Sequence, residues 1–309
     1  MRILVTGGAG FIGSHIVDAL LARGHAVAVL DNLTTGSKAN VAAAAELYEV
    51  DLRDRAAVQG VFAAFPAEVV FHHAAQADVR RSMDEPAYDA AVNILGSLHL
   101  LEAAARHGTT RFIYASSGGA IYGEPHSLPV REDHPILPLS NYGVSKATVE
   151  PYLRVAAATS GMRTTALRYA NVYGPRQNPK GEAGVVAIFA TLMLQGKQAT
   201  IFGDGEKTRD YVYVEDIVRA NLLAFERGID GAFNIGTGVR TTDFEVYTAV
   251  QGALGTSLAP IYGPRRKGEV EHIALDAALA KEKLGWAPSV DFAEGVRRAV
   301  AFYRQLAAG

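Results

Sequence analysis

The first residues of the chain constrain its fold more than any other segment. The apolar run Arg2–Thr6 leads directly into the glycine-rich segment Gly7–Gly13, and the helical pattern Ile12–Arg23 begins within it. Glycines at such a junction let the chain turn sharply and let the helix pack closely against the strand. The segment therefore predicts a strand–turn–helix unit, the first element of a layered α/β fold.

Strands and helices then alternate through the first half of the chain. Alternation of this kind implies right-handed crossovers and a parallel sheet covered on both faces. We therefore predict a Rossmann-type, doubly wound α/β fold. The expected strands are Arg2–Thr6, Ala26–Asp31, Leu47–Asp51, Val69–His73, Arg111–Ser116 and Thr164–Arg168, and the expected helices are Ile12–Arg23, Arg55–Ala64, Ala87–His107 and Tyr142–Ser160.

The pattern changes after Asn171, where Gly174-Pro175-Arg176 interrupts the alternation and later elements become shorter. A chain of 309 residues is also long for one compact core. We therefore predict a dinucleotide-binding-type domain over residues 1–172 and a smaller C-terminal α/β lobe mainly over 173–309, with some segments returning to the first domain. The expected later elements are helices Val185–Gln195, Glu215–Glu226 and Phe244–Leu254, strands Thr200–Phe202 and Tyr211–Val214, and helices after Asp276 and Phe292.

Composition and charge narrow the possible partners. Lys and Arg number 30 against 32 Asp and Glu, so no net charge attracts nucleic acid or an anionic membrane. The chain has no cysteine, which excludes disulfides, thiolate nucleophiles and cysteine-ligated zinc, and we predict no metal site. No stretch reaches the roughly 18 apolar residues of a membrane-spanning helix. Because nothing calls for an oxidising compartment, we expect a cytoplasmic protein.

A dinucleotide is the ligand that suits the glycine-rich turn. Gly10 lets the backbone approach a pyrophosphate, and the helix N-terminus adds amide donors and partial positive charge. Asp31 follows Gly13 by 18 residues, at the end of a strand, where a carboxylate binds both ribose hydroxyls and repels a 2′-phosphate. No arginine or lysine adjoins Asp31, the nearest being Lys38, so NAD is favoured. A glycine turn without a ligand and a strand-end role for Asp31 are the alternatives.

A tyrosine and a lysine supply the candidate chemistry. Tyr142 and Lys146 stand four residues apart on a predicted helix, so their side chains share a face. A tyrosine of pKa about 10 is an effective base at neutral pH only when a nearby cation stabilises its phenolate. Lys146 and an oxidised nicotinamide would both do so. The spacing alone also suits a surface pair, and it is the upstream dinucleotide site that favours catalysis.

Several motifs resemble those of the extended short-chain dehydrogenases/reductases over nearly the whole chain. Besides the glycine turn, Asp31 and the Tyr142/Lys146 pair, they are His73-Ala74-Ala75, Asn93 and Ser116-Ser117-Gly-Gly-Ala-Ile-Tyr122-Gly123. Within that family, the second half is most similar to the UDP-glucose (UDP-galactose) 4-epimerases. The segments that carry this likeness are Arg168-Tyr-Ala-Asn171-Val-Tyr-Gly-Pro-Arg176, Phe202-Gly-Asp-Gly205 and Arg209-Asp-Tyr211-Val-Tyr-Val-Glu-Asp216.

The resemblance implies a reaction and a cofactor site. Tyr142 would take the proton of a sugar 4-hydroxyl while the C4 hydride passes to NAD, and both would return after the 4-keto sugar has turned over. Lys146 would support Tyr142, with Ser117 as the third catalytic residue. The predicted cofactor contacts are Gly7, Gly10, Phe11, Ile12, Gly13, Asp31, Asn32, Asp51, Leu52, Ala74, Ala75, Gln76, Asn93, Ser116, Tyr142 and Lys146. Asp51 fits equally well as the N-cap of the helix that follows it.

A UDP-sugar is the implied substrate. Asn171, Arg209 and Arg266 match positions that contact the diphosphate, and an arginine fork suits phosphate because it donates two hydrogen bonds. A surface ion pair with Asp210 or Glu206 is the alternative for Arg209.

Other residues would hold the remaining parts of the substrate. Ser117 would contact the sugar and Glu269 matches a ribose contact. Val185, Phe202 and Tyr211 would line the base and ribose pocket, although core packing is an equal alternative for Val185 and Phe202. Ile273 matches a position that limits the sugar pocket, but isoleucine permits no choice between plain and N-acetylated hexoses.

The chain departs from its relatives beside the predicted catalytic serine. Relatives place a serine or threonine where this chain has Gly118, so Ser117 would take over directly or through a water, with Ser116 as a weaker candidate. Gly119 and Ala120 occupy the positions where 4,6-dehydratases carry Asp-Glu and decarboxylases a Glu. Without a carboxylate there, elimination or decarboxylation lacks its acid or base, and epimerisation is the simplest remaining reaction.

Three functions stay open at this point. They are a UDP-hexose 4-epimerase, another sugar-nucleotide oxidoreductase such as a reductase or a UDP-glucuronate epimerase, and a non-catalytic dinucleotide-sensing protein. A uronate epimerase would need a group for the sugar carboxylate, and the sequence does not reveal whether Arg80 or Arg81 reaches it. The resemblance also implies a homodimer formed through Ala87–His107 and Tyr142–Ser160, and the alternative is that both helices only cover the sheet.

Overall fold

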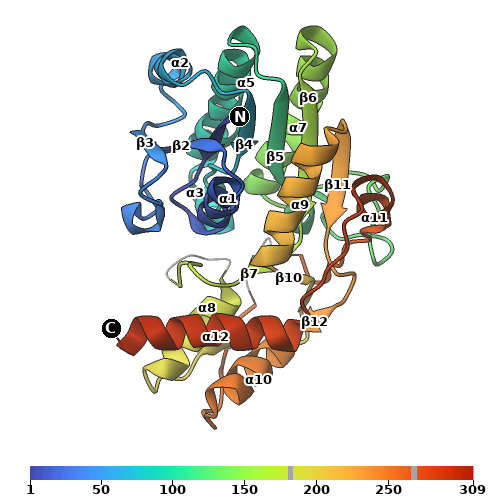
Figure 1. Ribbon diagram of the computed structural model, residues 1–309. Coiled ribbons are helices and arrows are strands. Elements are labelled where there is room, and N and C mark those ends of the chain that lie inside the picture. The colour runs from blue at the N-terminus through green and yellow to red at the C-terminus, as the bar shows by residue number, and fades with distance from the viewer. Residues whose placement is uncertain (180–183, 266–269, 309) are drawn as a thin grey trace.

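A seven-stranded parallel sheet forms the centre of the larger of two lobes (Figure 1). The structure is a computed structural model that describes residues 1–179, 184–265 and 270–308. The strand order is β11-β6-β5-β4-β1-β2-β3, which confirms the predicted Rossmann-type architecture. The strands are β1 (Arg2–Thr6), β2 (Ala26–Asp31), β3 (Glu46–Glu49), β4 (Val69–His72), β5 (Arg111–Ser117), β6 (Arg163–Tyr169) and β11 (Gly231–Ile235).

Helices bury both faces of this sheet. In β1, Ile3 and Val5 belong to one apolar core, and Leu4, which points the other way, belongs to a second. Burial on both faces explains why the strands are continuous apolar runs rather than alternating ones. The first face carries α1 (Phe11–Ala22), α9 (Val214–Arg227) and α11 (Ala278–Leu284), and the second carries α2 (Arg55–Ala64), α5 (Gly96–Arg106) and α7 (Asn141–Ser160).

Segments from the second half of the chain complete the larger lobe. β11 pairs with β6, with Ala232 opposite Ala166, and α9 packs beside α1 (Figure 1). The change of sequence pattern near residue 172 therefore does not coincide with a single division in space.

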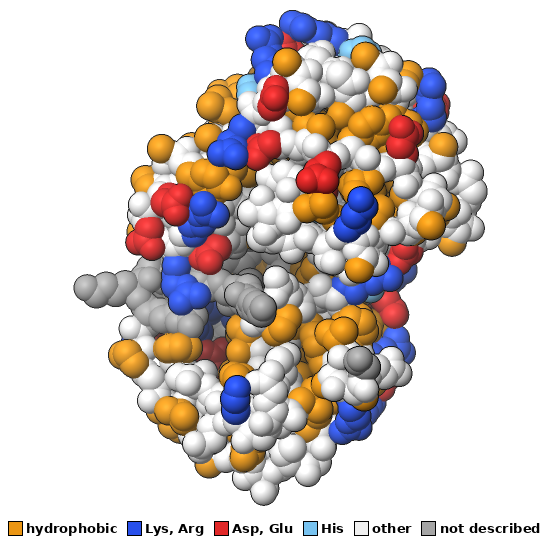
Figure 2. All heavy atoms as spheres, turned by 90° about the vertical axis from the view of Figure 1, so that its left-hand side faces the viewer, with side chains coloured by type: hydrophobic (Ala, Val, Ile, Leu, Met, Phe, Trp, Pro, Cys, Tyr) orange, Lys and Arg blue, Asp and Glu red, His pale blue; other side chains and the backbone are white. Residues whose placement is uncertain are grey.

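The smaller lobe has a core of its own. Its strands, as far as the structure describes the chain, form two-stranded sheets, and α12 runs across its outer side (Figure 1). Figure 2 shows acidic and basic side chains interspersed over one face of the larger lobe, in keeping with the nearly balanced charge of the chain. The paired strands are β7 (Asn171–Tyr173) with β10 (Tyr211–Tyr213), β9 (Thr208–Arg209) with β12 (Thr241–Thr242), and β8 (Thr200–Phe202) with β13 (Ile261–Gly263), and the helices are α8 (Val185–Leu194), α10 (Asp243–Leu254) and α12 (Phe292–Ala308).

The boundary predicted for the third strand is wrong. β3 ends at Glu49, so Asp51 lies in the loop that follows the strand rather than at its end. Asp51 is not the cap of α2 either, because the N-cap is Asp54, whose side chain accepts a hydrogen bond from the Ala57 amide. Two aspartates three residues apart fit a cap pattern equally well, and only the backbone path separates them.

The long helix predicted over residues 87–107 is three consecutive segments. α4 (Pro86–Ala90) is followed by a π-helical turn, η2 (Ala91–Leu95), before α5 begins. The short helices α3 (Val79–Asp84) and α6 (Gly118–Ile121) were not predicted, because neither is long enough to display a helical period. A π turn inside a helix often marks a functional position.

Candidate active site

The predicted site residues gather at the carboxyl edge of the larger sheet, where ligands bind in open α/β folds. Gly7 follows β1, Asp31 ends β2, and Ser117 ends β5. This edge adjoins the smaller lobe, since β6 ends at Tyr169 and β7 begins at Asn171.

The glycine turn is built so that side chains are excluded from it. Gly7 has φ +68°, and a Cβ there would lie 2.6 Å from the Ala74 amide nitrogen. A Cβ on Gly13 would collide with the Gly7 carbonyl oxygen, which is why the helix can pack so closely. Gly10 is the N-cap of α1 and supplies no side-chain cap, so first-turn amides are left for a ligand. These residues therefore fit the pyrophosphate of a dinucleotide.

Asp31 is tied to this turn. Its carboxylate accepts hydrogen bonds from the Ala9 amide at 3.0 Å and the Leu33 amide at 2.8 Å. Burial raises the pKa of Asp31, and the two amides oppose that rise. Each carboxylate oxygen keeps a second lone pair, so Asp31 can still accept from ribose hydroxyls.

Asn32 and Asp51 meet at the neighbouring strand ends. The Asn32 side chain donates to Asp51 at 2.9 Å, and Arg53 donates two hydrogen bonds to the same carboxylate. Arg53 therefore holds the pKa of Asp51 far below its usual range. Arg53 was not among the predicted residues. Because Asp51 occupies its guanidinium, Arg53 does not provide a free partner for a 2′-phosphate.

α7 positions Tyr142 and Lys146 in its first turns. The helix begins after Ser140, whose side chain caps it by accepting from the Gly143 amide at 3.1 Å. The Tyr142 amide is held by the Ser82 hydroxyl at 3.0 Å. Lys146 is 4% exposed, and its Nζ lies 4.7 Å from the centre of the Tyr114 ring.

Burial shifts both groups toward their uncharged forms. It raises the pKa of Tyr142 to about 12, with a hydrogen bond to the Ser117 side chain acting in the opposite direction. It lowers the pKa of Lys146 to about 8, opposed by the charges of Asp89 and Glu150. A further positive charge beside Tyr142 would be needed to form a phenolate at neutral pH.

The two serines at the end of β5 have different partners. Ser116 donates to Glu150 at 2.6 Å, whereas the Ser117 side chain faces Tyr142 and lowers its pKa. Successive strand residues point to opposite faces, which explains the difference. A Cβ at Gly118 would collide with the end of the Leu275 side chain, so a side chain there requires Leu275 to move. Leu275 therefore occupies the space beside Gly118.

A buried ion pair next to Ser116 was not predicted from the sequence. Arg168 donates to both oxygens of Glu150, at 3.0 and 2.6 Å, and also to the Tyr122 hydroxyl at 2.7 Å. Glu150 in turn orients Ser116. Arg168 belongs to a recognised motif, but nothing in the spacing indicated that Glu150 would be its partner.

Asn93 and Gln76 form a closed network rather than open contacts. The Asn93 amide group donates to the Gln76 carbonyl, Asp89 and Ser145, and its oxygen accepts from the Gln76 amide. The hydrogen-bonding capacity of Asn93 is therefore used within the protein, which favours a positioning role over a direct cofactor contact.

The predicted substrate residues are only partly brought together. The Asn171 side chain lies beside Gly119, whose Cβ would be 3.4 Å from its oxygen. Arg209 donates to the carbonyl oxygens of Thr208 and Glu271. Tyr211 is buried, with its ring packed against Tyr173 and Phe292. Val185 begins α8 and Phe202 ends β8, both partly buried, while Arg266 and Glu269 lie outside the described residues.

Asp210 does not pair with Arg209. Its fully buried carboxylate accepts from the amides of Thr237, Gly238 and Leu275 and from the Thr237 hydroxyl. Its backbone carbonyl accepts from the Asn171 amide at 2.8 Å. Asp210 therefore joins the segments that surround Asn171 and Leu275.

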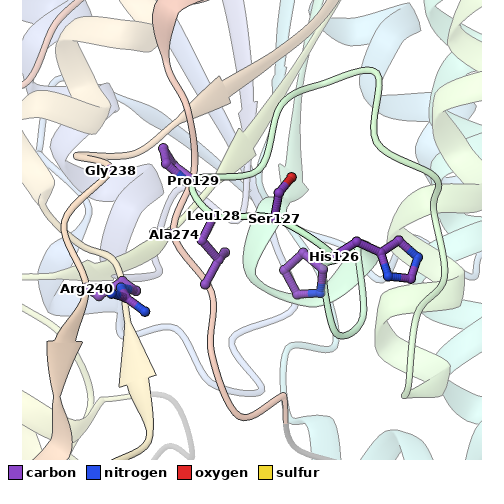
Figure 3. Close-up of a pocket in the computed structure, with 8 residues that line it drawn as sticks. His126, Ser127, Leu128, Pro129, Gly238, Arg240 and Ala274 are labelled. Carbon is purple, nitrogen blue, oxygen red and sulfur yellow. The ribbon is translucent and has the colours of Figure 1, made fainter.

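Two cavities of the surface lie away from these residues. One cavity of about 520 Å³ lies between the loop that carries His126 and the segment that carries Arg240 (Figure 3). A second, of about 910 Å³, lies over the outer side of α7, lined by Val144, Ala147 and Pro151. Neither contains a predicted site residue, so the candidate site is defined by its side chains and not by the depth of a pocket.

The described residues contain no helix long and apolar enough to cross a bilayer. They also contain no cluster of histidine and acidic side chains that could hold a metal ion.

Residues 3–236 match the model of the NAD dependent epimerase/dehydratase family. A putative UDP-glucose 4-epimerase of Methanocaldococcus jannaschii is 47% identical over 298 residues, covering 96% of this chain and 97% of that protein. The crystal structure of a Thermotoga maritima UDP-glucose 4-epimerase with UDP-glucose is 50% identical, with a TM-score of 0.98, covering 99% of this chain and 100% of that one. A Thermus thermophilus UDP-glucose 4-epimerase in complex with NAD is 48% identical, with a TM-score of 0.94, covering 98% and 99%.

The chain belongs to the NAD dependent epimerase/dehydratase family. Its cofactor is NAD, in agreement with the glycine turn and Asp31.

Proposed function

We infer that this protein is an NAD-dependent 4-epimerase of UDP-hexoses that works through a 4-keto sugar. The observation that carries this conclusion is the buried Tyr142–Lys146 pair beside Ser117, in a segment without a carboxylate. The similarity to UDP-glucose 4-epimerases along nearly the whole chain supports the same reaction.

Tyr142 is the proposed acid and base. Its oxygen takes the proton of the sugar 4-hydroxyl and later returns it, while Ser117, hydrogen-bonded to Tyr142, shares that proton path. Lys146 stabilises the phenolate by its charge. NAD, when bound, accepts the hydride from C4 and returns it to the other face of the sugar.

The neighbouring residues limit the chemistry to epimerisation. Gly119 and Ala120 offer no acid or base to sugar C5, and Gly119 lies against the Asn171 side chain. A 4,6-elimination would need a proton donor and acceptor at this place.

We propose that the larger lobe binds NAD and the smaller lobe grips the nucleotide. Asn171 and Arg209, with Arg266, are the proposed diphosphate contacts, and Glu269 is the proposed ribose contact. Phe202 and Val185 stay as proposed pocket residues, whereas the burial of Tyr211 in the second core favours support of the pocket from behind.

A uronate substrate is less well supported. Arg81, one of the two arginines considered for a sugar carboxylate, stacks on Tyr88 at 4.0 Å and pairs with Glu85. The guanidinium of Arg81 is therefore already paired with Glu85 and is not available to bind a sugar carboxylate.

We also propose a homodimer in the cytoplasm. Large apolar side chains are exposed along η2 and α7, including Leu95 at 53% and Val155 at 56%. A second copy related by a twofold axis would bury these matching faces. Sedimentation would test the proposal, and a single species of 32.8 kDa would contradict it.

The activity test uses three substrates. Purified protein is incubated with UDP-galactose, UDP-N-acetylgalactosamine or UDP-glucuronate without added cofactor, and the products are separated. Conversion of UDP-galactose is expected, because the cofactor is regenerated in each cycle. Conversion of none of the three would refute the epimerase function, and conversion of the uronate alone would favour the second candidate.

A further inference from the structure

A buried carboxylate outside the predicted site lies beside the catalytic pair. Asp89, the fourth residue of α4, is 1% exposed. It accepts hydrogen bonds from the side chains of Gln76 and Asn93, both at 3.0 Å and both at the same oxygen. Both donors are uncharged amides, so the described contacts give Asp89 no arginine or lysine as a partner. A buried carboxylate normally has such a partner, because isolated charges are costly to bury.

The network links Asp89 physically to α7. Asn93 lies in the π turn that follows Asp89, and its amide donates to the Ser145 hydroxyl at 3.1 Å. Ser145 is the residue before Lys146 and donates to the Tyr142 carbonyl at 3.0 Å. Asp89 and Asn93 are four residues apart on this helical run, so both side chains reach Gln76 from the same face.

The charge of Asp89 acts on the same pair. It raises the pKa of Lys146 and also that of Tyr142. Glu150 raises the pKa of Lys146 as well, but its own charge is matched by the two hydrogen bonds from Arg168. Asp89 is therefore the unmatched negative charge near Lys146.

The other titratable groups around the pair are either uncharged or at the surface. Tyr114 on β5 and His73 after β4 are neutral, because burial raises the pKa of the tyrosine and lowers that of the histidine to about 3. His72 is likewise neutral, since burial lowers its pKa. The charged residues of α3 and the turn before it, none of them buried, are Asp78, Arg80, Arg81 and Asp84.

We propose that Asp89 is a positioning residue that serves as the buried counter-charge of Lys146 and thereby sets the pH range in which the Tyr142–Lys146 pair works. This inference rests on the proposed roles of Tyr142 and Lys146. Burial alone favours the neutral form of Lys146, and a neutral lysine cannot stabilise a phenolate. Asp89 keeps Lys146 charged, at the cost of making Tyr142 harder to ionise.

The variant Asp89→Asn separates the effect of the negative charge of Asp89 from the effect of its hydrogen bonds. The amide oxygen of asparagine can accept the same two hydrogen bonds, so the network is kept while the charge is lost. Removing a negative charge lowers both pKa values, so the acid limb of the kcat profile, set by Tyr142, and the alkaline limb, set by Lys146, both move toward lower pH. We expect each limb to move by about one pH unit. Difference absorbance of the phenolate, with Tyr142→Phe as the reference, should show the same downward shift in the holoenzyme.

Two controls separate charge from structure. Asp84→Asn makes the same substitution at an exposed position of α3 and should leave both limbs in place. Ser145→Ala removes a hydrogen bond of the network without changing any charge, and it should lower turnover at all pH values without moving the limbs.

The outcomes are distinct. A profile of Asp89→Asn that is lower but unshifted would overturn the proposal, because a purely structural role predicts that result. Asp89→Ser, which also lacks the charge, gives the same test if the asparagine variant does not fold. Should Tyr142→Phe keep its turnover, the proposed acid–base roles fail and the role of Asp89 fails with them. An inactive Tyr142→Phe with an unshifted Asp89→Asn overturns the role of Asp89 alone.

Discussion

The two lobes build their halves of the site in different ways. In the larger lobe, Lys146, Asn93 and Ser116 are buried, and each contacts defined partners within the protein. In the smaller lobe, Arg209 and Phe202 are partly exposed and lie on strands of two or three residues. Proton transfer requires controlled pKa values, which burial supplies, whereas a substrate that enters and leaves needs groups that solvent can reach. The residues proposed for proton transfer therefore belong to the buried core of the larger lobe, and the residues proposed to bind the substrate belong to the more exposed part of the smaller lobe.

The strongest test of this contrast is Tyr142→Phe. It removes the proton-transferring oxygen but keeps the ring, so we expect turnover to fall about 10³-fold or more. Binding of UDP, measured by calorimetry, should change little because the smaller lobe is untouched. Tyr152→Phe, on the exposed side of the same helix, should behave as the wild type. If Tyr142→Phe retains activity, Tyr142 is not the acid and base, and the proposed division of chemistry and binding between the lobes is wrong.

Arg209→Met tests the other lobe. Loss of a charged hydrogen-bond donor to the diphosphate costs about 2 kcal/mol, so we expect KM to rise about 30-fold. kcat should stay within a few-fold of the wild-type value. Steady-state kinetics measure both, with Arg23→Met as a control at a distant surface ion pair. A fall in kcat at unchanged KM would show that the two lobes do not divide binding from chemistry.

Ser117→Ala and Ser116→Ala sharpen the contrast within the larger lobe. The hydroxyl of Ser117 is bonded to Tyr142, so we expect its loss to lower kcat about 10-fold or more. Ser116 is bonded to Glu150, and its loss should mainly cost about 1 kcal/mol of unfolding free energy. Equal small effects on kcat would indicate that a water, and not Ser117, completes the proton path.

Gly118→Ser is expected to have the smallest effect on the comparison, because Gly118 and its neighbour Leu275 both lie in the larger lobe. The new side chain meets Leu275, so we expect a loss of about 1–2 kcal/mol in unfolding free energy. Denaturant unfolding measures this loss. Adding Leu275→Ala should recover part of it relative to Leu275→Ala alone, and strictly additive effects would contradict the steric explanation.

Local patterns were sufficient where the physical cause is itself local. The turn at Gly7 needs positive φ and a close backbone approach, and only glycine provides both, so three glycines and a strand predicted the turn proposed to bind the cofactor. The position of Asp31 at a strand end and the shared helix face of Tyr142 and Lys146 were likewise predicted from local sequence. The division of the long helix by a π turn was not, because one extra residue hardly alters a helical period.

The sequence by itself therefore determined the layered fold, the glycine turn, the proposed catalytic pair and the absence of a carboxylate at Gly119 and Ala120. Only the tertiary structure decided which serine faces Tyr142, which side chain crowds Gly118, and that Asp89 and Glu150 lie near Lys146. The reason is physical: periodicity and turn chemistry act over a few residues, whereas burial and charge depend on segments that meet only after the sheet has formed.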